Sequence, residues 1–316
     1  MKKDFTPIAL NNIKTYSIAD RQSKVSTDDF AATWEKGKSF QDFLDTLPRI
    51  LAADDLKTVI NAIVKAHSSN NTVMFSMGAH VIKVGLNPLI IDLMEREVIT
   101  SVSLNGAGII HDSELAMTGQ TSEDVAASLG SGNFGMAKET GEFLSRAIIS
   151  AEKQQIGLGR AVGSAILDGG FPHADKSILA AGARLNIPVT VHVAMGTDII
   201  HMHPGFDPAA AGAASHRDFR IFSSVVSELE SGVYLNIGSA VIMPEVFLKA
   251  ITLVRNLGHK VENFTTVNMD FIRHYRPMTN VVNRPTAGGG RGINMVGSHE
   301  ILLPLIAAGV IEVIKT

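Results

Sequence analysis

Short apolar runs alternate with longer amphipathic segments along most of this chain. From position 72 onward, runs rich in β-branched residues have the length and composition of buried strands. They lie at Thr72–Met77, Ser101–Leu104, Ile187–Val193, Val233–Ile237 and Phe264–Val267. Helical spacing of apolar residues predicts helices at Leu86–Arg96, Met136–Gln154, Lys176–Leu185, Phe219–Glu230 and Pro244–Leu257. Strands that alternate with helices in this way predict right-handed βαβ units and an α/β fold with a doubly wound parallel sheet.

Residues 1–70 show a different pattern of apolar and polar positions. The first forty positions are polar and weakly periodic, and they contain the sole tryptophan, Trp34. Phe40–His67 shows helical spacing of apolar residues. We therefore expect an N-terminal extension with helices over residues 1–70, packed on something else such as a neighbouring subunit, followed by one domain over residues 71–316.

Composition narrows the class of protein. The chain has 316 residues, of which 45% are hydrophobic and 19% charged, as in a globular protein with a substantial core. A net charge of -3 without a long basic run argues against nucleic-acid or membrane-surface binding. The absence of cysteine excludes disulfides, thiolate zinc sites and cysteine nucleophiles. The start lacks the apolar region of a signal peptide and no run is long enough to span a membrane, so we expect a cytoplasmic protein.

The segment Ser103–Asp112, SLNGAGIIHD, carries the strongest functional signal. A buried strand leads into what reads as a glycine turn, with His111 and Asp112 directly beyond it. Glycines at the carboxyl end of a parallel strand let the backbone approach a ligand closely, and open parallel sheets bind ligands at that edge. His111 and Asp112 are therefore the candidate acid/base pair.

Three glycine clusters indicate a function less clearly. The formal G-x-G-x-x-G over Gly130–Gly135 lacks a preceding strand, which favours a glycine-rich connection over a dinucleotide fingerprint. Gly238–Ala240, including Ser239, follows a predicted strand and forms either a phosphate seat or a tight turn. Gly288–Gly292 surrounds Arg291, and it forms either an anion-binding loop that acts as a lid or a flexible surface loop.

Histidines and a carboxylate gather in the segment HVAMGTDIIHMHP. In an extended segment, His201 and His203 would present both rings on one face. Together with His111 and Asp198 they could hold a divalent metal such as zinc, whereas hydrogen-bonded histidines of a nucleotide pocket are the alternative interpretation. No G-x-S-x-G elbow and no Walker loop occurs.

The order of these features after about position 70 resembles the deoxyhypusine synthase family. NGAGIIHD at 105–112 resembles the TAGGxEED turn of that family, and LNIGSAVIMP at 235–244 is similar to its ILGGGVVKH segment. The resemblance implies a Rossmann-like sheet, NAD as cofactor and a homotetramer with active sites between subunits. It also implies that the cofactor lies against the following residues: Asn105, Gly106, Ala107, Gly108, Asp198, Gly238, Ser239, Asn268 and Ser298.

The chain departs from the family where the deoxyhypusine chemistry takes place. That reaction passes through an imine on a lysine late in the chain, next to a tryptophan and a glycine. After Lys260 this sequence has only Lys315, and Trp34 is far from it. The family's acidic residues for spermidine are replaced around Arg276–Arg291 by neutral or basic residues. An imine needs an amine nucleophile, so we expect the scaffold to be kept and the deoxyhypusine reaction to be absent.

The sequence thus predicts a deoxyhypusine-synthase-like, NAD-binding homo-oligomer that acts on a small, anionic substrate as a transferase or oxidoreductase. His111 and Asp112 would exchange protons, and Arg291 would orient the substrate. Two alternatives stay open at this point: a metal-dependent hydrolase that uses His111, Asp198, His201 and His203, and a non-catalytic nucleotide-binding scaffold.

Overall fold

The computed structural model describes residues 3–314 and centres on one parallel sheet. The sheet has six strands in the order β3-β2-β1-β4-β5-β6, and all neighbours pair in parallel. The strands are β1 (Val73–Met77), β2 (Ser101–Asn105), β3 (Val189–His192), β4 (Val233–Ile237), β5 (Thr265–Asp270) and β6 (Arg291–Val296). The predicted α/β fold with a Rossmann-like parallel sheet is confirmed.

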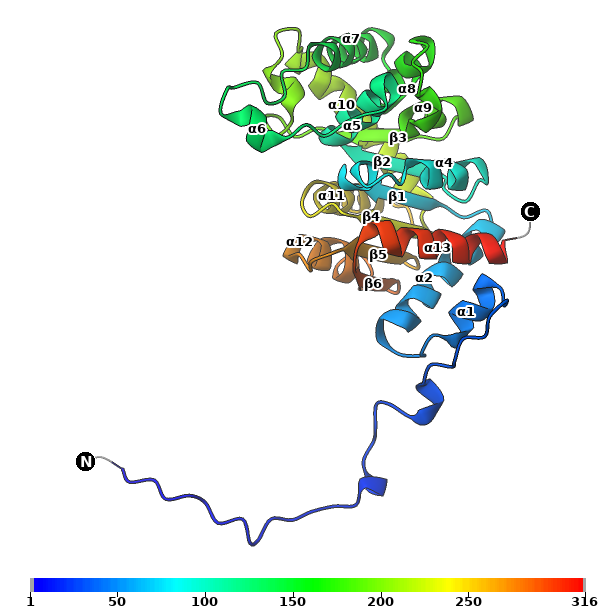
Figure 1. Ribbon diagram of the computed structural model, residues 1–316, viewed down its shortest axis with the longest axis vertical. Coiled ribbons are helices and arrows are strands. Elements are labelled where there is room, and N and C mark those ends of the chain that lie inside the picture. Colours follow the sequence, from blue (N-terminus) through cyan, green and yellow to red (C-terminus); the bar gives the residue numbers. More distant parts are fainter. Residues whose placement is uncertain (1–2, 315–316) are drawn as a thin grey trace.

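Helices follow most strands and cover both faces of the sheet (Figure 1). They are α1 (Phe40–Thr46), α2 (Leu51–Ser68), α3 (His80–Lys83), α4 (Asn87–Glu95), α5 (Gly106–Thr118), α6 (Val125–Leu129), α7 (Lys138–Gln154), α8 (Leu158–Asp168), α9 (Ile178–Leu185), α10 (Pro208–Ser227), α11 (Ile242–Asn256), α12 (Tyr275–Pro277) and α13 (His299–Val313). Short 3₁₀ and π segments lie at Ile18–Asp20, Thr27–Asp29, Ala174–Lys176, Ile199–Met202 and Met278–Asn283. No helix within residues 3–314 is long and apolar enough to cross a membrane.

Side chains that alternate along each strand divide the core into two parts. Phe75 belongs to the larger cluster, which includes residues of α2, α4 and α13. Tyr234 belongs to the smaller cluster with residues of α10 and α11, and its ring stacks on Phe247 with the ring centroids 3.7 Å apart. Both faces of every central strand are therefore buried, which explains why these strands read as continuous apolar runs.

One row of polar residues crosses the entire sheet on the α10 and α11 face. The register aligns, strand by strand, Thr190, Ser103, Ser76, Asn236, Asn268 and Asn294. Asn236 Nδ2 donates to Asn268 Oδ1 at 2.8 Å, and Asn268 Nδ2 donates to Asn294 Oδ1 at 2.8 Å. These side-chain bonds tie the last three strands together beside the backbone ladder.

The sixth strand was not predicted. The loop predicted at Gly288–Gly292 overlaps its first two residues, and Arg291–Val296 pairs with β5 at the edge of the sheet. Its side chains alternate between buried and exposed, since an edge strand meets solvent, so it lacks the continuous apolar run of the central strands. The five predicted strands and the five predicted helices are confirmed. Most bounds differ by a few residues, but the helix predicted at Phe219–Glu230 begins much earlier, at Pro208.

The N-terminal segment before α1 extends away from the sheet (Figure 1). It exposes large apolar side chains, with Phe5 85% and Ile8 86% exposed. Trp34 lies closer to the body, with its ring edge-to-face against Phe43 at 5.8 Å between centroids. In contrast to this segment, α2 contributes to the main core through residues such as Val59 and Ile63.

Candidate functional site

The carboxyl edge of the sheet has its topological switch point between β1 and β4. From these two strands the chain proceeds in opposite directions, to β2 and β3 on one side and to β5 and β6 on the other. Such a point is where open α/β sheets bind ligands. Gly78 and Gly238 follow the two strands, and a Cβ on Gly78 would lie 2.2 Å from the carbonyl oxygen of Gly238. Only glycine fits at position 78, because the two loops touch through their backbones.

Gly238 and Ser239 occupy a tight turn that leads into α11. Gly238 has φ +64°, and a Cβ there would lie 2.8 Å from Cε1 of His299. The hydroxyl of Ser239 accepts a hydrogen bond from the backbone N–H of Met243, in the first turn of α11, at 3.1 Å. Of the two interpretations given for this segment, the packing here accounts for the tight turn without a ligand.

Strand β2 runs directly into helix α5, without the predicted glycine turn. Asn105, the last residue of β2, is the N-cap, and its Oδ1 accepts from the N–H of Gly108 at 3.1 Å. A Cβ on Gly106 would lie 2.1 Å from Oδ2 of Asp198, and one on Gly108 would lie 2.9 Å from Cβ of Leu104. These glycines allow close packing at the start of α5. Because His111 and Asp112 lie on this helix, their side chains point in different directions.

A cavity of about 540 Å³ opens beside the start of α5. Three predicted site residues line it together: Ala107, His111 and Asp198. The other charged residues of the lining are Lys83, Glu114 and Glu123. Three carboxyl groups and one ammonium group do not favour the anionic substrate that we expected from Arg291. Sequence reasoning missed Lys83, Glu114, Thr121 and Glu123, because they lie on segments without a recognisable motif.

His111 is held neutral in this cavity. Burial, and secondly the nearby charge of Lys83, lower the pKa of His111 from 6.5 to about 4. Nδ1 of His111 lies 2.7 Å from the hydroxyl of Thr121. Burial also raises the pKa of the Asp198 carboxyl, and the nearby His201 opposes that rise. Near neutral pH the imidazole is thus a base without charge, as a proton acceptor needs to be.

Asp112 lies on the other side of α5 and is completely buried. Its carboxylate accepts from the hydroxyl of Ser177 at 2.5 Å and from the backbone N–H groups of Ile178 at 2.9 Å and Leu179 at 3.1 Å. Asn87 Nδ2 donates a further hydrogen bond at 2.9 Å. Asp112 therefore holds the start of α9 in place, and the geometry separates it from His111 and from the cavity.

Arg291 lies at the opposite edge of the sheet from His111. It is the first residue of β6 and pairs with Thr265, the first residue of β5. Since all strands are parallel, Arg291 is at the amino edge, and the predicted role in orienting a substrate beside His111 is wrong for geometric reasons. Asn268 is fully buried within the asparagine row, whereas Ser298 is exposed at the carboxyl edge as the N-cap of α13.

The alternative metal set is not assembled. Ile199–Met202 forms a 3₁₀ turn instead of an extended segment, so the rings of His201 and His203 diverge. Nδ1 of His201 accepts from the N–H of Gly196 at 3.1 Å, and Nε2 of His203 lies 2.9 Å from the carbonyl oxygen of Gly135. In the described part of the chain no group of three or more His, Cys, Asp or Glu side chains could hold a metal ion.

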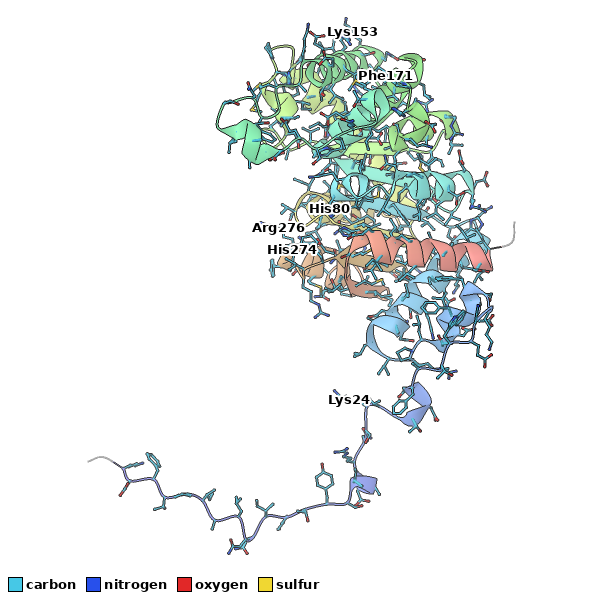
Figure 2. The ribbon with its side chains drawn as sticks, in the orientation of Figure 1. Lys24, His80, Lys153, Phe171, His274 and Arg276 are labelled. Atoms are coloured by element: carbon cyan, nitrogen blue, oxygen red, sulfur yellow. The ribbon has the colours of Figure 1, made fainter. Side chains whose placement is uncertain are left out.

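A second group of histidines lies at the carboxyl edge near the switch point. His80 starts α3, and its ring lies 5.5 Å from that of His299 and 6.4 Å from that of Phe271. Figure 2 shows His80, His274 and Arg276 on the same side of the molecule, from the first and second halves of the sheet. His274 Nε2 lies 3.9 Å from Asp270 Oδ2. No motif pointed to this group, because His80 is far from His274 and His299 in the sequence.

Comparison with known proteins supports the fold. Neither a family model nor a curated protein matches the sequence. A candidate deoxyhypusine synthase from Entamoeba histolytica superposes with TM-score 0.53 at 14% identity, over 90% of this chain and 96% of that one. The apo arginine dihydrolase ArgZ of cyanobacteria gives 0.51 at 13% identity, over 84% of this chain. AgrE, in its ternary complex with ornithine and NAD+, gives 0.50 at 14% identity, also over 84% of this chain.

These likenesses show the fold alone. The chain spans 33% of the arginine dihydrolase chain and 34% of the AgrE chain, so the likeness concerns only about a third of each of those proteins. The deoxyhypusine synthase, in contrast, corresponds over nearly its full length. This chain therefore shares a Rossmann-like fold with that deoxyhypusine synthase structure.

Proposed function

We propose that this chain is a deoxyhypusine-synthase-like protein that binds NAD or a related dinucleotide at the carboxyl edge of its sheet. The observation that carries the proposal is the strand order 3-2-1-4-5-6, with touching glycine loops at the switch point and a cavity at the same edge. Dinucleotides bind at this point in sheets of this order. One solved neighbour of the fold is a complex with NAD+.

The residues at this edge suit a dinucleotide. Asp198 could accept hydrogen bonds from ribose hydroxyls, the role that an acidic residue has in many such sites. Gly78 lies at a backbone contact that a side chain would disrupt. NAD would supply a site for hydride transfer. His111, neutral and half-buried in the cavity, would then take a proton from a small substrate held against α5.

The test is a thermal melt with NAD, NADH and NADP. A ligand that binds only the folded state at about 100 times its Kd raises stability by about 2.7 kcal/mol. We expect Asp198→Asn to reduce the rise in Tm with NAD. Arg291→Gln should keep the full rise, because Arg291 is at the opposite edge. Flat melts with every dinucleotide would contradict the proposal.

We further propose that the protein is a homo-oligomer, on the tetrameric pattern that the family resemblance implies. The support is the N-terminal segment, which exposes Phe5, Ile8 and Tyr16 away from its own subunit. Large exposed apolar residues are typical of contact surfaces. Light scattering of the full chain measures the assembly state, and a monomer at all concentrations would contradict this part of the proposal.

A further inference from the structure

A hydrogen-bonded chain of four side chains starts at His111 and runs along the cavity lining through Thr121 and Glu114 to Thr140. Nδ1 of His111 lies 2.7 Å from Oγ1 of Thr121, and that hydroxyl lies 2.5 Å from Oε2 of Glu114. The other carboxylate oxygen of Glu114 accepts from the hydroxyl of Thr140 at 3.0 Å. The chain thus joins helix α5, the segment after it and helix α7.

The donor count fixes the direction of each bond. A carboxylate only accepts hydrogen bonds, and Glu114 receives one on each oxygen from a threonine hydroxyl. Thr121 has a single hydroxyl proton, which it donates to Glu114. Its oxygen can then only accept from His111, so Nδ1 of His111 must carry a proton.

The other ring nitrogen is left for the cavity. A neutral imidazole with its proton on Nδ1 has a lone pair on Nε2. Within residues 3–314, Nε2 of His111 has no hydrogen-bond partner, nor is it among the buried polar atoms that lack one. His111 lines the cavity, so this lone pair is available to a bound molecule.

We propose that Thr121 and Glu114 are positioning residues that hold His111 as the Nδ1–H tautomer, with Nε2 as the proton acceptor of the cavity. The proposal deepens the proposed function, since it assigns the atom of His111 that would take a proton from a substrate. Glu114 and Thr121 act through His111. A base held in one tautomer is poised for its task, because the wrong tautomer presents an N–H where a lone pair is needed.

The test is nitrogen NMR of the histidine rings in the full chain at neutral pH, which needs no substrate. The His111 signals are assigned as those missing from His111→Gln. We expect wild-type protein to show a protonated Nδ1 and a lone pair on Nε2. Thr121→Val keeps the shape of the side chain without the hydroxyl, and it should move the ring toward the Nε2–H tautomer. Thr121→Ser should restore the wild-type pattern.

Glu114→Gln is a second test variant, in which the hydrogen bond between Thr121 and residue 114 would reverse its direction. The amide nitrogen would donate to Thr121, whose hydroxyl could then donate to Nδ1 of His111 and move the proton to Nε2. Thr118→Val is the matched control, since the Thr118 hydroxyl lies on the same helix and bonds only backbone carbonyl and N–H groups. An Nε2–H ring in the wild type, or an unchanged tautomer in Thr121→Val, would overturn the proposal.

The outcome for the tautomer is separate from the outcome for the cofactor. If no dinucleotide changes the melting temperature but Thr121→Val shifts His111 to the Nε2–H tautomer, the proposed function fails and the positioning of His111 stands. If NAD binds but the tautomer of His111 is the same in Thr121→Val and Glu114→Gln as in the wild type, the proposed function stands and the positioning of His111 fails.

Discussion

The Cα of Gly106 lies directly against the carboxylate of Asp198, and a Cβ at position 106 would be 2.1 Å from Asp198 Oδ2. This contact joins the start of α5 to the loop after β3, two elements that together form one wall of the cavity. The position of Asp198 therefore depends on the absence of a side chain at Gly106. A carboxylate at the start of a helix is also favoured by the helix dipole.

Gly106→Ala should displace Asp198 and lower the free energy of unfolding by about 1–3 kcal/mol, the usual cost of overpacking. Asp198→Ala removes the group that the new methyl would meet. The loss caused by Gly106→Ala should therefore be smaller in the Asp198→Ala background, which a double-mutant cycle from urea denaturation measures. Additive effects would show that the two residues do not meet.

Asp112→Ala should act on stability and leave the cavity intact. The change removes the acceptor of Ser177, Ile178 and Leu179 in the buried interior, where orphaned donors are expensive. Because a buried donor without an acceptor costs about 1–3 kcal/mol, we expect the free energy of unfolding to fall by several kcal/mol. Asp175→Ala, at an exposed carboxylate nearby, should change it by less than about 0.5 kcal/mol. A stable Asp112→Ala protein without dinucleotide binding would restore Asp112 to the functional site.

The buried strands could be predicted because their signal is local. Val233–Ile237 is buried on both faces, so its apolar run identifies it without knowledge of its neighbours. Arg291–Val296 could not be found in this way, since it is an edge strand whose pairing with β5 is a long-range fact. The glycines before it drew attention to Arg291 as an anion ligand, although strand direction places it at the other edge.

The site was only partly visible for a related reason. His111 stood out because it follows a strand, and the cavity does include it. Its neighbour Asp112 shared the same motif, but on a helix adjacent residues point in different directions, about 100° apart. The glycine-rich start of α5 disguised that helix as a turn. No sequence pattern pointed to Thr121 and Glu114, since their roles come from hydrogen bonds that form only in the folded chain.

Deoxyhypusine synthesis should be absent. Incubation with spermidine, NAD and a lysine acceptor should give no modified protein, and borohydride should trap no imine. Lys83 is the lysine that lines the cavity, on α3 and early in the chain, far from the position that the family uses. Peptide mapping after borohydride is the check. An adduct on Lys83 would contradict this expectation and show that the amine nucleophile has moved.

Asn268→Leu should weaken the half of the sheet that ends in β6. Asn268 is the central member of the asparagine row. The change removes the acceptor of the buried Asn236 on β4 and the donor to the half-buried Asn294 on β6. Unsatisfied buried amides cost about 1–3 kcal/mol each. Hydrogen exchange should report faster opening of Arg291–Val296 than of Ser101–Asn105. Equal protection in the variant and the wild type would indicate that the row contributes nothing.

Stability should also depend on the protonation of His192, at the end of β3. Burial lowers the pKa of His192 from 6.5 to about 3, and its Nε2 lies 3.1 Å from the hydroxyl of Thr190. The unfolded chain therefore binds a proton at pH values where the folded protein does not. The contribution of His192 is complete above pH 6.5 and is lost progressively as the pH falls toward 3.

Asp218 changes the pH dependence of stability in the opposite direction, so the effect of His192 has to be isolated with a variant that removes only His192. Burial raises the pKa of Asp218 to about 7, against backbone hydrogen bonds that include those from Gly159 and Val191. Its contribution is complete at low pH and is lost as the pH rises toward 7. His192→Gln keeps an acceptor or donor for Thr190 but cannot titrate. Between pH 7 and pH 5, the wild type should lose about 1–2 kcal/mol more than this variant. Parallel curves of unfolding free energy against pH would show that His192 titrates normally in the folded protein.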